Sequence, residues 1–216
     1  MHYTNVTADE FTVVDGVDDW RYLLGAIHAE FRAGSFTAAA ALVSAIAAAA
    51  ERFEHHPDIS MRYPDRVRVV LTTHAVHDLT TLDVDVAREI SAIAKQMTAT
   101  GEPTTPQCIE VAIDTLDADR IRPFWAAVLD YREVGGSLVD PLGVGPSMWF
   151  QTMTAARNER SRFHIDVSVA HDVAETRVAA ALAAGGTLVT EEFARSWWVL
   201  ADADGNEACV CTWQDR

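Results

Sequence analysis

A weak internal repeat in the second half of the chain constrains its fold more than any other feature. Glu110 and His164 each lie in an apolar strand pattern that is followed by a turn containing aspartate and then by a helical pattern. Phe124 follows Glu110 at the same interval at which Val178 follows His164, and each copy closes with further strands. Repeated units of this size share one core. We therefore expect two βαβββ modules over residues 108–216.

A stretch rich in threonine and proline separates these modules from the first half. Residues 98–107 read TATGEPTTPQ and lack hydrophobic periodicity, as linkers do. The length of 216 residues accommodates two small domains. We predict a first domain at residues 1–100, a linker at 101–107 and a second domain at 108–216.

The first half has the pattern of an α+β domain. Residues 36–53 are dense in alanine and predict a helix that ends near His55, because a proline follows closely. Residues 67–73 alternate in polarity, as a half-buried strand does. A second helix is expected over residues 80–97, with a threonine as its cap. For residues 20–31 we expect a short helix, or a helix that leads into a strand.

The charge balance excludes several classes of partner. The 17 basic and 32 acidic residues give a net charge of −15, which opposes binding to nucleic acids and to anionic membranes. No apolar run approaches the roughly 20 residues of a membrane span, and the N-terminus lacks the pattern of a signal peptide. The three cysteines are an odd number, so we expect reduced thiols. We predict a cytoplasmic protein without nucleic-acid or membrane partners.

Three histidines in the first half form the strongest candidate site. His55 and His56 lie at the end of the predicted helix and His74 lies at the end of the predicted strand, so one cleft could hold all three. Imidazole titrates near pH 6.5, so neighbouring rings can include a proton donor and a proton acceptor at neutral pH. Metal binding is the competing interpretation, although the adjacent pair would converge on one ion only awkwardly.

The residues around these histidines resemble the pterin-4a-carbinolamine dehydratase family. The pattern consists of Glu51-x-x-x-His55-His56-Pro57, an aromatic at Tyr63, the sequence THxxxxLTxxD over residues 73–83 and an upstream Trp20. The resemblance covers residues 10–97. It implies a lyase that dehydrates 4a-hydroxytetrahydropterin to the quinonoid dihydropterin without a cofactor. It also implies an antiparallel sheet with helices on one face and assembly into a homodimer or homotetramer.

The same resemblance implies roles for individual side chains around the pterin. We expect His55 and His74 to transfer protons, His56 to orient the substrate, and Glu51 to polarise an imidazole one helical turn away. The side chains expected to contact the substrate are Trp20, Pro57, Tyr63 and Asp83.

Several of these residues also have a structural interpretation. His55-His56-Pro57 can be a helix stop, Asp83 can be an acid favoured by the dipole at a helix start, and Trp20 can be a core residue. Three further histidines match no motif position and are expected on the surface: His28, His77 and His171.

The second half resembles the glyoxalase/bleomycin-resistance/dioxygenase superfamily, whose members are also called vicinal oxygen chelate proteins. The resemblance rests on residues 124–129, 162–167 and 200–207 and spans residues 108–214. It implies that the two modules form a cupped sheet, with metal ligands on the first and last strand of each module. Those positions are Glu110, Gln151, His164 and Glu207.

This ligand set would suit some divalent ions better than others. Three oxygen ligands and one imidazole favour Mn²⁺, Fe²⁺ or Ni²⁺ over Zn²⁺. A pocket without metal is the alternative, because many relatives in this superfamily bind ligands without one.

The two resemblances together predict a pterin carbinolamine dehydratase fused to a glyoxalase-like domain. One alternative is a metal-dependent glyoxalase or dioxygenase in the second half, with the first half serving assembly. Another is a protein without catalysis that binds a small molecule or mediates dimerisation.

Overall fold

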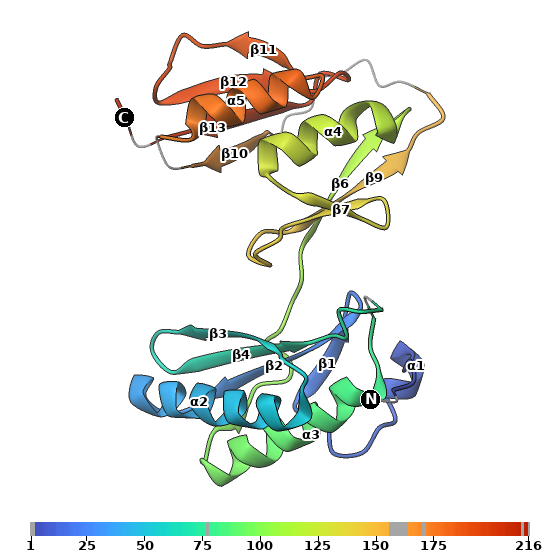
Figure 1. The fold of residues 1–216 in the computed structure, drawn as a ribbon, viewed down its shortest axis with the longest axis vertical. Helices are drawn as coiled ribbons and strands as arrows, with labels where there is room; N and C mark the ends of the chain where they lie inside the picture. The colour runs from blue at the N-terminus through green and yellow to red at the C-terminus, as the bar shows by residue number, and fades with distance from the viewer. Residues whose placement is uncertain (1–2, 77, 156–163, 170–171, 213, 216) are drawn as a thin grey trace. The chain divides into compact units, whose positions relative to one another are not determined.

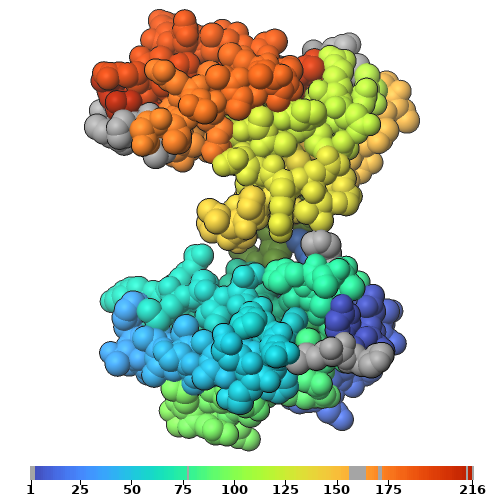
Figure 2. Space-filling view, in the orientation of Figure 1, coloured from blue at the N-terminus to red at the C-terminus, as the bar shows by residue number. Residues whose placement is uncertain are grey.

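The chain folds into two compact units in the computed structural model, Met1–Cys108 and Ile109–Arg216. The structure describes all residues except 1–2, 77, 156–163, 170–171, 213 and 216. We refer to Met1–Cys108 as unit 1 and to Ile109–Arg216 as unit 2. The space-filling view shows each unit as a closely packed body (Figure 2). The predicted α+β class is confirmed for both units.

Unit 1 consists of an antiparallel sheet with two long helices on one face (Figure 1). The strands follow the order β1-β2-β4-β3, and the short β5 pairs with β2. The apolar side chains of β2 and β4 pack against the two long helices in a single core. The elements are α1 (Ala8–Phe11), β1 (Trp20–Leu23), β2 (Ala26–Arg32), α2 (Phe36–Phe53), β3 (Asp58–Arg62), β4 (Arg66–Leu71), α3 (Thr81–Gln96) and β5 (Thr100–Gly101).

Helix α2 has the bounds that its sequence predicts. The Ser35 side chain caps the first turn by accepting a hydrogen bond from the Ala38 backbone at 3.1 Å. Leu42 and Ile46 are buried against the sheet. Among the described helices, α2 alone is long and apolar enough to cross a membrane, a test that core helices of soluble proteins also pass.

The segment from residue 20 to residue 31 differs from the prediction of a helix. It forms strands β1 and β2, which pair in antiparallel register from Trp20 opposite Ala29 to Leu23 opposite Ala26. Leu24 and Gly25 make the turn with φ values of 51° and 80°. A two-residue turn with positive φ at both positions matches the twist of a hairpin, so tertiary pairing overrides the helical periodicity.

The predicted linker is part of unit 1. Thr100–Gly101 pairs with β2, and the Glu102 backbone N–H donates to the Glu30 carbonyl at 2.7 Å. Arg66 donates to the Glu102 carboxylate at 2.8 Å, and Arg68 donates to the Gln107 carbonyl at 3.3 Å. These two arginines alternate with buried valines along β4, so residues 102–107 lie against the sheet face that the helices leave open.

Unit 2 contains the two predicted βαβββ modules. Each module has a four-stranded sheet in which the first and last strands run parallel, with the order β6-β9-β8-β7 in one and β10-β13-β12-β11 in the other. Helices α4 and α5 contribute Phe124, Trp125 and Val178 to one shared core. The elements are β6 (Glu110–Thr115), α4 (Ala118–Leu129), β7 (Arg132–Val134), β8 (Ser137–Val139), β9 (Ser147–Thr152), β10 (Ile165–Ser168), α5 (Ala174–Ala183), β11 (Thr187–Thr190), β12 (Trp197–Ala201) and β13 (Glu207–Cys211).

Candidate functional site

The end of helix α2 places His55 inside unit 1. Glu54 adopts the left-handed conformation, and the His55 backbone N–H donates back to the Ala50 carbonyl at 3.2 Å. This geometry terminates the helix and turns the chain inward. The His55 ring is buried, and its Nε2 lies 2.6 Å from Oδ1 of Asp83 at the start of α3.

Asp83 is fully buried and satisfies several donors at once. Its Oδ2 accepts from the Thr80 backbone N–H at 2.7 Å, which completes a capping box, and from the Thr73 hydroxyl at 2.8 Å. Burial by itself raises the pKa of Asp83, but the hydrogen bonds from His55, Thr80 and Thr73 outweigh burial and hold that pKa below its usual value. Asp83 is therefore a carboxylate at neutral pH.

The pair of His55 and Asp83 has the properties of a positioned acid or base. An ionised carboxylate can only accept a hydrogen bond, so Nε2 of His55 carries the proton and Nδ1 is left to exchange one. A buried carboxylate in this position fixes the tautomer and the orientation of an imidazole. Asp83 thus contacts His55 and is shielded from solvent.

His56 and Glu51 form a second pair on the surface. The His56 Nε2 lies 3.3 Å from Oε1 of Glu51, and both side chains are exposed. Glu51 was expected to polarise an imidazole one helical turn away. In the structure the imidazole that Glu51 contacts is His56, whereas His55 pairs with Asp83.

His74 lies one residue beyond the hydrogen-bonded group around Asp83. Thr73, whose hydroxyl donates to Asp83, immediately precedes it, and a backbone bridge to Asp78 closes the turn. The side chain of His74 is exposed. The structure thus brings the main chain of His74 to the His55–Asp83 pair, and the convergence of three rings on one substrate stays a prediction.

Two of the four side chains expected to contact the substrate lie inside the core. Trp20 is 1% exposed, and its indole N–H donates to the Ser91 hydroxyl at 3.1 Å inside the core, so the structural interpretation is correct. Asp83 is 0% exposed and contacts His55 rather than solvent. Both side chains are enclosed by core packing, which local sequence does not reveal.

The other two expected contacts lie at opposite ends of one hairpin. Pro57 is half-buried and follows His56 directly. Tyr63 is 87% exposed in the turn that joins β3 to β4, whereas His56 precedes β3 and His74 follows β4. A five-residue strand spans about 16 Å, so the structure separates Tyr63 from the histidines.

His28 is buried on the open face of the sheet, contrary to the expectation of a surface position. Its Nε2 lies 3.3 Å from the Leu23 carbonyl and its Nδ1 lies 3.2 Å from a nitrogen of Arg68. Burial and the charge of Arg68 lower the pKa of His28 to about 4, so the ring is neutral. His77 and His171 lie outside the described residues.

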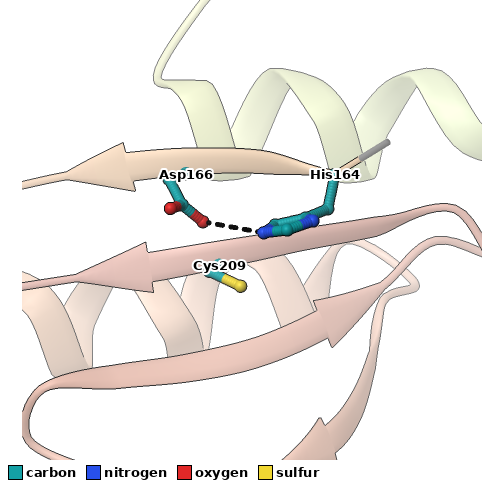
Figure 3. A group of neighbouring side chains, drawn as sticks. All are labelled: His164, Asp166 and Cys209. Atoms are coloured by element: carbon teal, nitrogen blue, oxygen red, sulfur yellow. Dashed lines mark ion pairs between the residues drawn. The ribbon is translucent and has the colours of Figure 1, made fainter. Parts of the chain in front are cut away.

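A different group of side chains meets in unit 2 (Figure 3). His164 directly precedes strand β10, Asp166 lies on β10, and Cys209 lies on the neighbouring β13. The ligand atoms of all three lie within 4.8 Å of one another. Among the described residues, this is the one such group of three or more His, Cys, Asp or Glu. Burial, the charge of Asp166 and its hydrogen bond raise the pKa of Cys209 to about 12.

The strand register separates Glu110 from Gln151, two of the four metal ligands expected from the repeat. Glu110 lies opposite Ser147, whose hydroxyl donates to it at 3.1 Å, whereas Gln151 lies opposite Asp114 at the other end of the strand pair. Neither Glu110 nor Glu207 belongs to the group around His164. Binding of one metal ion by all four residues stays a prediction.

Sequence reasoning missed Asp166 and Cys209, although a signal was present. His164 and Asp166 are two residues apart, as are Glu207 and Cys209, and alternate residues of a strand share a face. The parallel register then places Asp166 opposite Cys209.

Comparisons with known proteins identify both halves. The family model described as pterin 4 alpha carbinolamine dehydratase matches residues 4–93, and the model described as glyoxalase-like domain matches residues 110–211. A relative from Nocardia farcinica that carries the pterin-4-alpha-carbinolamine dehydratase name is 40% identical over 43% of this chain and 98% of its own length. A relative of the same name from Chloroflexus aurantiacus is 44% identical over 35% of this chain and 80% of its own.

Solved structures are similar to each half separately. A transcriptional coactivator/pterin dehydratase from Brucella melitensis has 31% identity and a TM-score of 0.37, covering 42% of this chain and 99% of that one. A glyoxalase/bleomycin resistance protein/dioxygenase family enzyme from Burkholderia phytofirmans has 20% identity and a TM-score of 0.40, covering 48% and 95%. The chain belongs to the pterin-4a-carbinolamine dehydratase family through unit 1, and its unit 2 is a glyoxalase-like domain.

Proposed function

We propose that unit 1 dehydrates 4a-hydroxytetrahydropterin to the quinonoid dihydropterin. The observation that carries this proposal is the buried pair of His55 and Asp83, held by Thr73 and Thr80 at the end of helix α2. The exposed His56 follows His55 in the chain and the exposed His74 follows Thr73. One fixed imidazole and two accessible imidazoles would provide the acid and the base that a dehydration needs once they meet the substrate.

The reaction requires two proton transfers and no electron acceptor. A protonated imidazole gives its proton to the C4a hydroxyl, the C–O bond breaks, and water leaves. A neutral imidazole takes the proton from N5, and the N5 electron pair forms the double bond to C4a. We assign this proton exchange to His55 and His74 and the orientation of the pterin to His56. No cofactor takes part in these steps.

The test is a dehydration assay on the full chain with chemically generated carbinolamine. His74→Ala and His55→Gln should each lower kcat by roughly 100-fold or more, as expected for the loss of a positioned acid or base. Glutamine retains a donor for Asp83, so His55→Gln is the variant that keeps the buried carboxylate paired. Val76→Ala, which truncates an exposed side chain in the turn of His74, is the matched control. Wild-type rates in both histidine variants would refute the assignment.

We also propose that the protein is a cytoplasmic homodimer or homotetramer that acts on a small pterin. The family supports assembly. The odd number of cysteines, three, supports a reducing compartment, and the net charge of −15 opposes anionic partners. Light scattering coupled to size-exclusion chromatography measures the subunit number. A monomer at micromolar concentration would contradict the assembly proposal.

A further inference from the structure

The group in unit 2 combines three kinds of metal-binding atom on one sheet face. The imidazole Nε2 of His164 lies 3.4 Å from Oδ1 of Asp166, and the thiol of Cys209 lies beside them (Figure 3). Ala208 and Val210 of β13 belong to the core of unit 2. Because side chains alternate along a strand, Cys209 lies on the face that points away from that core.

We propose that His164, Asp166 and Cys209 bind one divalent cation of the Zn²⁺ type within a single βαβββ module. Ligands that surround tetrahedral zinc at its usual bond lengths lie roughly 3.3 to 3.8 Å from one another. The separation of 3.4 Å between His164 and Asp166 already has this value, and all three ligand atoms lie within 4.8 Å. Small rotations of the exposed His164 and Asp166 side chains would bring the longer separations into this range.

The donor atoms determine which cation the site would prefer. A thiolate and an imidazole favour borderline and soft ions such as Zn²⁺ or Co²⁺, whereas Mg²⁺ and Mn²⁺ favour sites made of oxygen. This preference differs from the one that the oxygen-rich set of Glu110, Gln151, His164 and Glu207 would have. With three protein ligands, a fourth position stays open for water or a small anionic molecule, as in catalytic zinc sites.

The charge around the group also favours a cation. Asp166 lies opposite Cys209 in the parallel register, and Glu207 lies two residues before Cys209 on the same face. A divalent ion bound here would release the thiol proton to solvent. Its positive charge would offset the repulsion between the thiolate and the two carboxylates.

The test is a Co²⁺ titration of the full chain after removal of metals with a chelator. We expect one equivalent to bind with a thiolate-to-cobalt charge-transfer band in the near ultraviolet, and Zn²⁺ to displace it. Cys209→Ser should abolish that band and weaken Zn²⁺ binding by 100-fold or more, and His164→Gln should weaken it by at least 10-fold. Cys211→Ser is the matched control, because Cys211 is buried on the same strand but lies outside the group.

Each outcome decides the proposal. Absence of binding, a cobalt spectrum without the thiolate band, or equal effects of Cys209→Ser and Cys211→Ser would overturn it. Binding that persists in Cys209→Ser but is lost in His56→Gln would place the ion at the unit 1 histidines and would also overturn it. Circular dichroism of each variant confirms that unit 2 remains folded. The readout is binding, so a failure here is distinct from a failure of the dehydration assay.

Discussion

The chain contains two pairs of histidine and aspartate whose surroundings differ. In unit 1, His55 and Asp83 are 2.6 Å apart with side-chain exposures of 10% and 0%. In unit 2, His164 and Asp166 are 3.4 Å apart with exposures of 53% and 58%. The first pair is fixed by two threonines, and the second shares its surface with a thiol.

The difference shows that residue type alone does not decide what such a pair can do. A buried carboxylate that is saturated with hydrogen bonds keeps its charge and locks one imidazole, which suits proton transfer to a bound substrate. An exposed pair can rotate and exchange water, so it gains order only when a ligand such as a cation holds both partners. Burial therefore separates a positioned acid–base pair from a candidate metal-binding pair.

The largest effect on activity and stability is expected when the buried carboxylate of Asp83 is neutralised. Asp83→Asn should lower the rate of carbinolamine dehydration by roughly 100-fold and the free energy of unfolding of unit 1 by about 3 kcal/mol. The reason is that the amide cannot accept from all the donors that now meet Asp83. Dehydration kinetics and urea unfolding measure the two effects.

The control for that variant lies on the same helix. Asp85→Asn neutralises an exposed carboxylate that pairs only with Arg88 at 3.3 Å, and it should leave both quantities close to the wild type. Equal behaviour of Asp83→Asn and Asp85→Asn would show that the buried pair has no special role. A shift of the pH optimum in Asp83→Asn would support positioning of His55 rather than a purely structural role.

Unit 1 should lose stability on acidification because of His28. The pKa of His28 is lowered to about 4 in the folded state, so between roughly pH 6.5 and pH 4 the unfolded chain binds a proton that the folded chain does not. The free energy of unfolding of unit 1 is thus highest above about pH 6.5 and decreases as the pH falls toward 4. The shift corresponds to about 3 kcal/mol, which partial solvent screening reduces to about 2 kcal/mol.

Urea unfolding at several pH values checks this expectation. His28→Gln should flatten the dependence between pH 6.5 and pH 4, whereas His56→Gln, which changes an exposed ring, should not. Below pH 4, protonation of Asp83 adds a second loss, because its lowered pKa means that its stabilising effect is present at higher pH and is lost on acidification. An unchanged slope in His28→Gln would contradict the buried neutral ring.

Unit 2 should instead be sensitive to alkaline pH when metals are chelated. The pKa of Cys209 is raised to about 12 in the folded state, so above roughly pH 8.5 the unfolded thiol releases a proton that the folded thiol retains. At pH 10 this should cost about 1 kcal/mol. Cys209→Ser should remove that component, and the exposed Cys108→Ser should not.

The smallest effect is expected at the exposed pair itself. Asp166→Asn should change the free energy of unfolding of metal-free unit 2 by less than about 0.5 kcal/mol, because exposed ion pairs contribute little. Differential unfolding with and without Zn²⁺ sharpens the comparison, since only the zinc-dependent stabilisation should decrease. A large loss without metal would mean that Asp166 has a packing role instead.

Local signals in the sequence predict much of the fold. The alanine-rich pattern and its flanking serine place α2 correctly, and the alternation around Val67 and Val69 places β4. The repeat predicts two βαβββ modules because its period is a property of the sequence itself. The prediction of a helix in the segment that forms β1 and β2 was wrong, because β2 pairs with β4, which lies far along the chain.

The candidate site was only partly predictable for the same reason. The motif identifies His55, His56 and His74, and Thr80-x-x-Asp83 has the spacing of a capping box. The partner of each imidazole depends on how helix ends meet, so the sequence did not show that Glu51 pairs with His56 and Asp83 with His55. Asp166 and Cys209 could be connected only through the register between two strands.

The docking of residues 102–107 on the sheet has a practical consequence for dissecting the chain. In a fragment that stops at residue 100, Arg66 would lose the Glu102 carboxylate and Arg68 would lose the Gln107 carbonyl. His28 would also lose its contact with Cys108. The threonine-rich and proline-rich stretch is thus an inappropriate place to cut. A fragment meant to fold as unit 1 should retain every residue through Cys108, and limited proteolysis should spare residues 102–107.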